Sequence, residues 1–174
     1  MYLKDKQQIW STEHGPNGGD EINLNQFESI DPINFGWPIS SYGYHYASSE
    51  VNIEGAIISD LDHEFYKKAP LHKSHDQFGF EEPKLFFTPS IGISAIASVE
   101  SEFIDKNVNL LFSSMGIHGL KNEKSIFAYN TNQNSYTKIF FGERIRDMKY
   151  MPNKYIVVFN GESSGMIGFL TKRK

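Results

Sequence analysis

The most restrictive feature of this sequence is a series of short apolar segments that are separated by turn residues. No window longer than about ten residues repeats apolar side chains with a helical period, so few helices are expected. The segments that we expect to be β-strands are Lys84–Thr88, Gly92–Val99, Val108–Ser114, Ser125–Asn130, Tyr136–Phe141, Ile145–Met151, Tyr155–Asn160 and Met166–Thr171. The last of these follow one another at intervals of roughly ten residues, the spacing of an antiparallel meander. The sequence therefore predicts an all-β fold.

Composition narrows the class of protein. The 174 residues amount to one domain or a piece of a larger one. A net charge of −4 argues against a nucleic-acid binder, and the absence of cysteine excludes disulfide scaffolds, thiolate metal sites and cysteine nucleophiles. No segment approaches the roughly 18 to 20 apolar residues of a membrane span, and the N-terminus has no apolar core of a signal peptide. Because a strand-like segment, Gln8–Thr12, follows almost at once, we expect an N-terminal part to be missing.

A polar, glycine-rich stretch, Glu13–Asp31, interrupts the strand pattern near the N-terminus. Its first residues combine glycines and a proline with Asp20 and Glu21. An irregular loop of this kind can turn its carbonyls inward, and together with carboxylates it offers the oxygen ligands that calcium prefers. The alternative is an ordinary turn between strands with solvated acids, which composition alone favours.

A second candidate site pairs Arg144 with Arg146. If these residues lie in a strand, both arginines project from one face and Ile145 from the other. Guanidinium groups roughly 7 Å apart repel each other unless an anion lies over them, and their planar forks suit carboxylates. Either a carboxylate-bearing ligand binds there, or neighbouring acids such as Glu143 and Asp147 pair with the arginines.

Two further groups of residues have both a functional and an ordinary interpretation. The charged stretch Ser59–Phe80 is expected to be a long surface insertion. It carries the histidines His63, His72 and His75. These could start a zinc site, although their spacing matches no known metal motif and surface histidines are common. The aromatic segments Phe35–Pro38 and Tyr42–Tyr46 could line a pocket for a planar ring or a sugar, or could pack in the core.

Taken together and in order, these motifs resemble the soluble PQQ-dependent sugar dehydrogenases, the glucose/sorbosone and aldose sugar dehydrogenase family. The segments that carry the resemblance are Trp10–Asn23, Asn34–Pro38, Ser41–Tyr46, Pro83–Ser94 and Gly142–Asp147. The resemblance runs from about Ile9 to Thr171 and is interrupted by the insertion at 59–80. It implies a six-bladed β-propeller, of which residues 1–174 would form roughly the C-terminal half of a single domain.

The resemblance also implies the site residues. The carbonyls of Gly15 and Pro16 would face a calcium ion beside the cofactor pyrroloquinoline quinone (PQQ), and Glu21 with the main chain of Phe35 would hold a second calcium ion. The residues implied to contact PQQ are Tyr46, Lys121, Arg144, Ile145 and Arg146. Because PQQ carries several carboxylates, the resemblance favours the ligand-binding interpretation of the two arginines.

The implied reaction is oxidation of an aldose at its anomeric hydroxyl, with hydride passed to PQQ. The family's general-base histidine lies upstream of the matched region, so we expect no catalytic base in this chain and no activity from it alone. The expected partners are an aldose, the missing N-terminal propeller half and a second copy that covers exposed blade faces. Family resemblance implies a periplasmic or secreted location. The alternative function is a non-catalytic, calcium-stabilised binding module, which the paired arginines disfavour.

Overall fold

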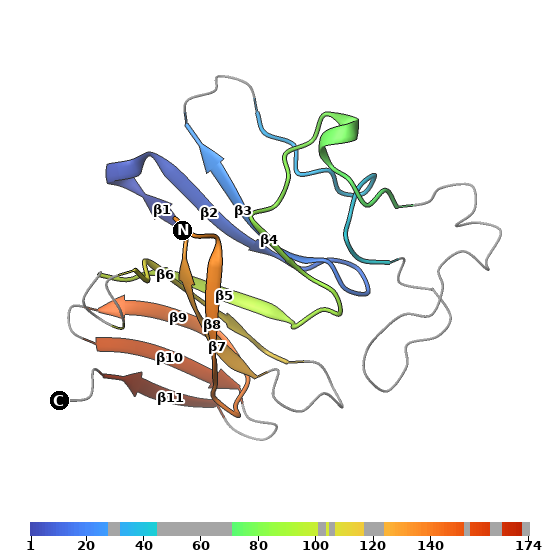
Figure 1. Ribbon diagram of the computed structural model, residues 1–174. Coiled ribbons are helices and arrows are strands. Elements are labelled where there is room, and N and C mark those ends of the chain that lie inside the picture. Colours follow the sequence, from blue (N-terminus) through green and yellow to red (C-terminus); the bar gives the residue numbers. More distant parts are fainter. Residues whose placement is uncertain are drawn as a thin grey trace. The chain divides into compact units, whose positions relative to one another are not determined.

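The computed structural model describes residues 1–27, 32–44, 71–100, 104, 107–116, 124–151, 154–160 and 165–171. These residues fall into two compact units, residues 2–91 and residues 92–171 (Figure 1). Throughout the described part of the chain, the regular structure consists of antiparallel strands and two short 3-10 helices. The all-β prediction is therefore confirmed, and the sheets are consistent with part of a β-propeller. The prediction of a single domain stays a prediction.

The first unit is built on one sheet in which strands adjacent in sequence are adjacent in space. Its elements are β1 (Tyr2–Leu3), η1 (Lys4–Lys6), β2 (Gln8–Glu13), β3 (Asp20–Gln26), η2 (Asp76–Phe78) and β4 (Leu85–Phe87). Trp10, Ile22 and Leu24 are buried and anchor the central strands. β3 lies in the polar stretch Glu13–Asp31, for which the sequence pattern predicts no strand.

The second unit contains two sheets, each a meander of consecutive strands. The first sheet consists of β5 (Ile93–Ser98), β6 (Leu110–Ser114), β7 (Ser125–Asn130) and β8 (Ser135–Phe140), and the second of β9 (Ile145–Met151), β10 (Lys154–Asn160) and β11 (Gly165–Leu170). Every strand predicted for this region is present. β7 and β9 have the predicted bounds, and the other strands differ from them by a residue or two at their ends.

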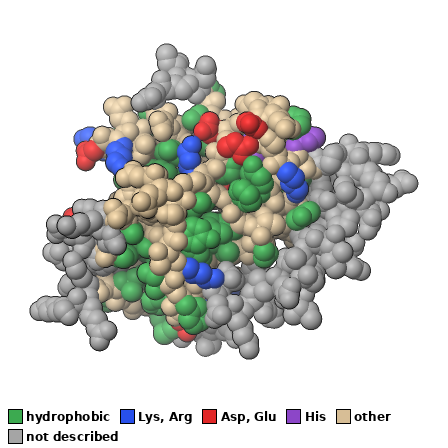
Figure 2. Space-filling view, viewed as in Figure 1, with side chains coloured by type: hydrophobic (Ala, Val, Ile, Leu, Met, Phe, Trp, Pro, Cys, Tyr) green, Lys and Arg blue, Asp and Glu red, His purple; other side chains and the backbone are tan. Residues whose placement is uncertain are grey.

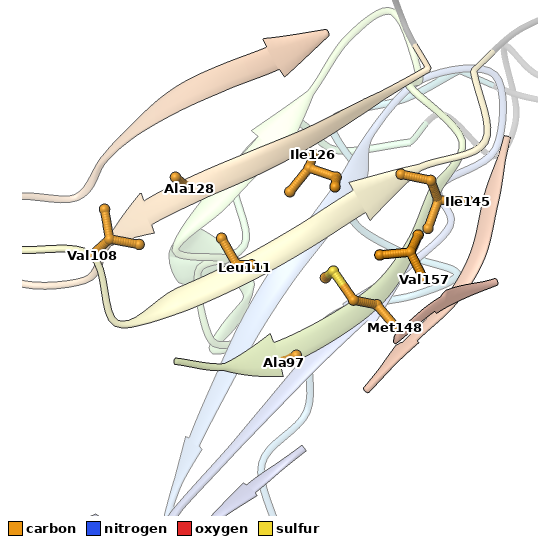
Figure 3. Close-up of a cluster of buried hydrophobic side chains, with 8 residues drawn as sticks. All are labelled: Ala97, Val108, Leu111, Ile126, Ala128, Ile145, Met148 and Val157. Atoms are coloured by element: carbon orange, nitrogen blue, oxygen red, sulfur yellow. The ribbon is translucent and has the colours of Figure 1, made fainter. Parts of the chain in front are cut away.

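Apolar side chains from both sheets of the second unit form its core. The cluster consists of Ala97, Val108, Leu111, Ile126, Ala128, Ile145, Met148 and Val157 (Figure 3). Leu111 and Ile126 come from the first sheet, whereas Ile145, Met148 and Val157 come from the second. In β9 the two core residues, Ile145 and Met148, are three positions apart, and the pairing of β9 with β10 shifts register between them. Burial of this apolar surface stabilises the unit.

The segment 71–80, the described part of the expected surface insertion, combines exposed residues with a few buried ones. Leu71 is buried and His75 has no exposed surface. The N–H of His72 donates to the carbonyl of Ile39, and the N–H of Ser41 donates to the carbonyl of His72. This segment is therefore packed into the first unit by backbone hydrogen bonds, whereas residues 59–70 lie outside the described part. No helix among the described residues is long and apolar enough to cross a membrane.

Candidate functional site

The loop between β2 and β3 is organised by the buried carboxylate of Asp20. The N–H of Gly15 donates to Asp20 Oδ1 at 3.3 Å, and the N–H of Ile91 donates to Asp20 Oδ2 at 3.0 Å. Asp20 has no exposed surface, and each of its oxygens accepts a hydrogen bond from the backbone. The sequence suggests Asp20 as an oxygen ligand for calcium, but these two hydrogen bonds give it a structural role in holding the loop.

The same loop approaches a second backbone segment closely at two glycines. Gly19 has a φ of +70°, and a Cβ at this position would overlap the backbone nitrogen of Gly43. A Cβ at Gly43 would overlap the carbonyl oxygen of Gly18. The N–H of Tyr44 donates to the carbonyl of Asn17 at 3.0 Å and closes the contact. Only glycine allows this approach of two backbones.

A pocket of about 90 Å³ lies beside the loop, in the first unit. Among its lining residues are Gly15, Pro16, Glu21 and Phe35, the residues that the resemblance implies as calcium ligands. The other lining residues are Glu13, His14, Gly19, Trp37, Ser40 and Ser41. The fold therefore brings together all the implied calcium ligands, although they come from the loop, from β3 and from the segment that begins at residue 32.

Glu21 is a buried carboxylate with little compensation for its charge. It lies on β3 with 7% of its surface exposed, and the side-chain amide of Asn23 donates to Glu21 Oε2 at 3.3 Å. Burial raises the pKa of Glu21 to about 7; the Asn23 hydrogen bond opposes this, whereas the carboxylates of Glu13, Glu82 and Asp20 add to it. A cation at this carboxylate would supply the charge that the surrounding protein does not.

His75 lies next to Glu21, a relationship that sequence reasoning missed. Its Nε2 is 3.6 Å from Glu21 Oε1, and within the described part of the chain neither of its ring nitrogens has a hydrogen-bond partner. The imidazole stacks on the ring of Tyr42, with centroids 5.2 Å apart and an interplanar angle of 11°. Tyr42 stacks in turn on Phe86 at 3.8 Å. In the sequence, His75 is one of several histidines in a charged stretch, and nothing there marks it as buried.

The carboxylate of Glu82 holds Tyr42 and His75 in place through hydrogen bonds. The hydroxyl of Tyr42 donates to Glu82 Oε2 at 2.7 Å, and the N–H groups of His75 and Asp76 donate to Glu82 Oε1 at 2.8 Å and 3.1 Å. Burial acts to raise the pKa of Glu82, but these hydrogen bonds hold it below its usual value. Burial and the bond to Glu82 raise the pKa of Tyr42 to about 12. Figure 2 shows acidic side chains (red) gathered near histidine (purple) on this face.

The residues of the pocket fit an oxygen-coordinated cation only if the main chain contributes. Among the described residues, no group of three or more His, Asp and Glu side chains is arranged to hold a metal ion. The buried Oδ1 of Asn23 has no partner, and Glu21 Oε1 faces His75 at a distance longer than a hydrogen bond. Carboxylate, amide and carbonyl oxygens are the ligands of calcium in proteins. Their chemistry therefore suits this cation.

The implied PQQ-binding residues that the structure describes lie in the second unit. Arg144 precedes β9, its Nε is buried without a hydrogen-bond partner, and its guanidinium donates to Met115 Sδ at 3.9 Å. Arg146 is exposed on β9. Ile145 is fully buried in the core, and its carbonyl accepts from Ser94 Oγ at 2.6 Å. The side chain of Ile145 is a core group, whereas Arg144 lies just before β9 and the pairing of β9 is irregular beside Arg146. That the two arginines share one face stays a prediction.

The alternative pairing of the arginines with neighbouring acids receives no support at Arg144. Within the described part of the chain, this guanidinium forms no ion pair with Glu143 or Asp147, and the carboxylate of Asp147 accepts from the N–H of Met148 at 2.8 Å. Tyr46 and Lys121, the other residues implied to contact PQQ, lie outside the described residues, as does His63 of the proposed zinc group.

Comparison with known proteins identifies the family. The family model "Glucose / Sorbosone dehydrogenase" matches residues 1–169. The chain is 29% identical over 163 residues to the aldose sugar dehydrogenase YliI of Escherichia coli (strain K12), covering 90% of this chain and 36% of that protein. It is 24% identical over 165 residues to an uncharacterized protein of Synechocystis sp., covering 92% of this chain and 33% of that protein. No solved structure gives a significant match. The chain thus spans about a third of the length of these relatives, and it belongs to the glucose/sorbosone dehydrogenase family.

Proposed function

We propose that this chain forms part of a PQQ- and calcium-dependent dehydrogenase that oxidises aldose sugars at the anomeric hydroxyl. Membership of the glucose/sorbosone dehydrogenase family supports a sugar dehydrogenase. The calcium and PQQ dependence is proposed from one observation, the pocket that Gly15, Pro16, Glu21 and Phe35 line together. These residues are the calcium ligands implied by family resemblance, and they come from separate segments of the chain.

In this proposal, the first unit holds calcium. Glu21 supplies a carboxylate whose pKa is raised by burial and by neighbouring carboxylates, which is the electrostatic setting in which a bound dication stabilises the charged form. The main chain of Phe35 supplies a further oxygen, and the carbonyls of Gly15 and Pro16 serve the calcium ion beside the cofactor. Asp20 does not bind the metal; it holds the loop in shape through the N–H groups of Gly15 and Ile91.

The arginines bind the carboxylates of PQQ. When bound, this cofactor supplies the hydride acceptor and calcium supplies a Lewis acid. Arg144 brings a buried Nε that has no protein partner, as expected of a guanidinium that binds an anionic ligand. Arg146, on β9, adds a second cation two residues further along the chain. Ile145 contributes through the backbone between them, and Tyr46 and Lys121 complete the proposed contacts.

The proposed enzyme also needs a general base and partners. The general base that takes the hydroxyl proton of the sugar is a histidine in the family, and we place it outside the matched region. The partners are then an aldose and the rest of the propeller. A second copy of this chain is the alternative occupant of the exposed apolar side chains on β8 and β11, which include Phe140, Ile167 and Phe169. A periplasmic or secreted location follows from the family.

The test is binding by the full chain, measured with calcium and PQQ separately. Calcium is added to metal-free protein during thermal melting, and PQQ is titrated while its absorbance and the protein fluorescence are followed. The proposal expects calcium to raise the midpoint and PQQ to bind in a calcium-dependent way. Calcium binding without any PQQ affinity would favour a calcium-stabilised binding module instead. Turnover of aldoses by this chain alone would contradict the assignment of the general base to another region.

A further inference from the structure

We propose that His75 is a ligand of the cation held by Glu21, so that this site accepts a transition-metal dication such as Zn²⁺ or Co²⁺ as well as calcium. The inference rests on the proposed cation site at Glu21. It adds a nitrogen ligand that the family resemblance does not include, and it names a second class of metal for the site.

The first observation is the burial of His75 without hydrogen-bond partners. The residue has no exposed surface, and neither Nδ1 nor Nε2 has a hydrogen-bond partner among the residues that the structure describes. Nδ1 faces the backbone of Gly36, where a Cβ would lie only 3.1 Å from it. Nε2 faces Glu21. Buried polar atoms in native proteins almost always have a partner, so an unpartnered imidazole nitrogen aimed at a carboxylate indicates a group between them.

The second observation is the distance between the two side chains. His75 Nε2 and Glu21 Oε1 are 3.6 Å apart, which is longer than an N–H···O hydrogen bond. Zinc binds imidazole nitrogen and carboxylate oxygen at about 2.0 to 2.2 Å, so two such ligands of a tetrahedral ion lie about 3.4 Å apart. The observed separation is therefore close to the span of a shared metal ion and too wide for a direct bond.

The third observation is the fixed orientation of the imidazole. The ring stacks on Tyr42, whose hydroxyl is bonded to Glu82, and Glu82 also accepts from the backbone N–H of His75. A ligand held in place by such partners loses little freedom when it binds a metal. The stack therefore keeps Nε2 directed at Glu21 whether or not a metal is bound.

The surroundings favour a dication electrostatically. The carboxylates of Glu13, Asp20 and Glu82 act on Glu21, and no lysine or arginine among the described residues forms an ion pair with it. Phe35, whose main chain is the further ligand in the proposed calcium site, lines the pocket beside Glu21. Calcium takes oxygen ligands, whereas imidazole suits zinc and related ions. A site with Glu21, His75 and a carbonyl therefore offers a mixed nitrogen and oxygen set.

The experiment is a Co²⁺ titration of the full chain after removal of metals with a chelator. The variants are His75→Phe, which keeps a ring for the Tyr42 stack but removes both nitrogens, and His72→Phe as the matched control. The ring of His72 packs on that of Phe78 in a tilted arrangement, and the ion pair of Glu21 is with His75. We expect a visible Co²⁺ absorption band in the wild type and in His72→Phe. His75→Phe should lose the band and more than about tenfold in Co²⁺ affinity, since even outer partners of metal ligands contribute about tenfold to a hundredfold.

Calcium-dependent melting of the same variants separates this inference from the proposed function. A calcium-induced rise in midpoint with no Co²⁺ band, or equal Co²⁺ affinity in His75→Phe and wild type, would overturn the role of His75 and leave the calcium site intact. Absence of both calcium and Co²⁺ binding would overturn both. If circular dichroism shows that His75→Phe is unfolded, His75→Gln replaces it, because the amide keeps an oxygen ligand; lower Co²⁺ affinity with retained calcium binding is then the supporting result.

Discussion

Glu13 and Glu21 occupy directly opposite positions on β2 and β3, and the side-chain amide of Asn23 bridges their carboxylates. Asn23 Nδ2 lies 3.0 Å from Glu13 Oε1 and 3.3 Å from Glu21 Oε2. Like charges that face each other across a sheet are destabilising, and one neutral amide cannot balance two carboxylates. The first unit therefore stores unfavourable electrostatic energy that protonation or a cation relieves.

The pH dependence of stability should report this energy in metal-free protein. The pKa of Glu21 is about 7 in the folded state against 4.5 for an ordinary glutamate, so the folded state binds the proton more tightly. The resulting stabilisation is fully present below pH 4.5 and is lost as the pH rises through about 7. The free energy of unfolding should fall by up to about 3 kcal/mol over this window. Urea unfolding at a series of pH values, with chelator present, measures it.

The matched variant for this measurement is Glu21→Gln, which cannot ionise. Its stability should change less with pH across the same window, and above neutral pH it should be the more stable protein in chelator. A wild-type protein whose stability rises between pH 4.5 and 7 would contradict the role of Glu21.

Calcium should raise the melting midpoint of the wild type and leave that of Glu21→Gln unchanged. A ligand that binds only the folded state adds RT ln(1 + [L]/Kd), about 2.7 kcal/mol at a hundredfold excess over Kd. Glu81→Gln is the control, because Glu81 pairs with Lys84 at the surface and does not line the pocket. It removes the same charge and should keep the response. Equal midpoints with calcium and with chelator in the wild type would rule out the calcium site.

Asp20→Asn should destabilise the first unit and weaken calcium binding indirectly. The substitution replaces one acceptor oxygen by an N–H₂ group, so the N–H of either Gly15 or Ile91 loses its buried partner. A buried unsatisfied donor costs about 1–3 kcal/mol. Denaturant unfolding gives the change, and calcium titration gives the loss of affinity. Unchanged stability would mean that the loop is held by other contacts.

Arg144→Ala and Arg146→Ala should each weaken PQQ binding by about tenfold or more while changing stability little. Charge-assisted hydrogen bonds contribute roughly 1.5–3 kcal/mol, and 1.4 kcal/mol corresponds to a factor of ten. PQQ titration followed by absorbance measures the affinity. Lys149→Ala removes an exposed cation from β9, the strand that carries Arg146, and is the control for a general effect of charge. If all variants bind PQQ equally, the arginines have a structural role.

Ile145→Val should affect the fold and spare the cofactor. The side chain of Ile145 is fully buried in the core cluster of the second unit, so removal of one methylene group should cost about 0.5–1.5 kcal/mol. PQQ affinity should remain at the wild-type value, because any contribution of this residue to the site comes from its backbone. Reduced affinity at unchanged stability would instead assign the side chain to the cofactor.

The strands of the second unit could be predicted because their sequence patterns agree with their structural role. β7 is a mostly apolar segment between turn residues and is buried throughout. In β9 the Ile145 side chain points inward, as its position between two arginines suggests. β3 could not be predicted in this way. It buries Asp20, Glu21 and Asn23, and buried polar residues resemble a solvated loop until their partners are known.

The candidate site was predictable as a set of residues but not as an arrangement. The resemblance names Gly15, Pro16, Glu21 and Phe35, and these residues line one pocket. His75 could not be found because its burial depends on contacts with residues more than thirty positions earlier in the chain, beginning with Tyr42. Local composition around His75 is charged, which in most chains indicates exposure.

The contact between Gly19 and Gly43 joins two segments that are not adjacent in the sequence. Each backbone occupies the space that a side chain on the other would need, so neither position tolerates even alanine while its partner segment keeps its path. A chimera that takes the loop between β2 and β3 from one homologue and residues 41–44 from another combines surfaces shaped for different counterparts. Recombination between this chain and its relatives should therefore yield folded products when both segments are inherited from the same parent.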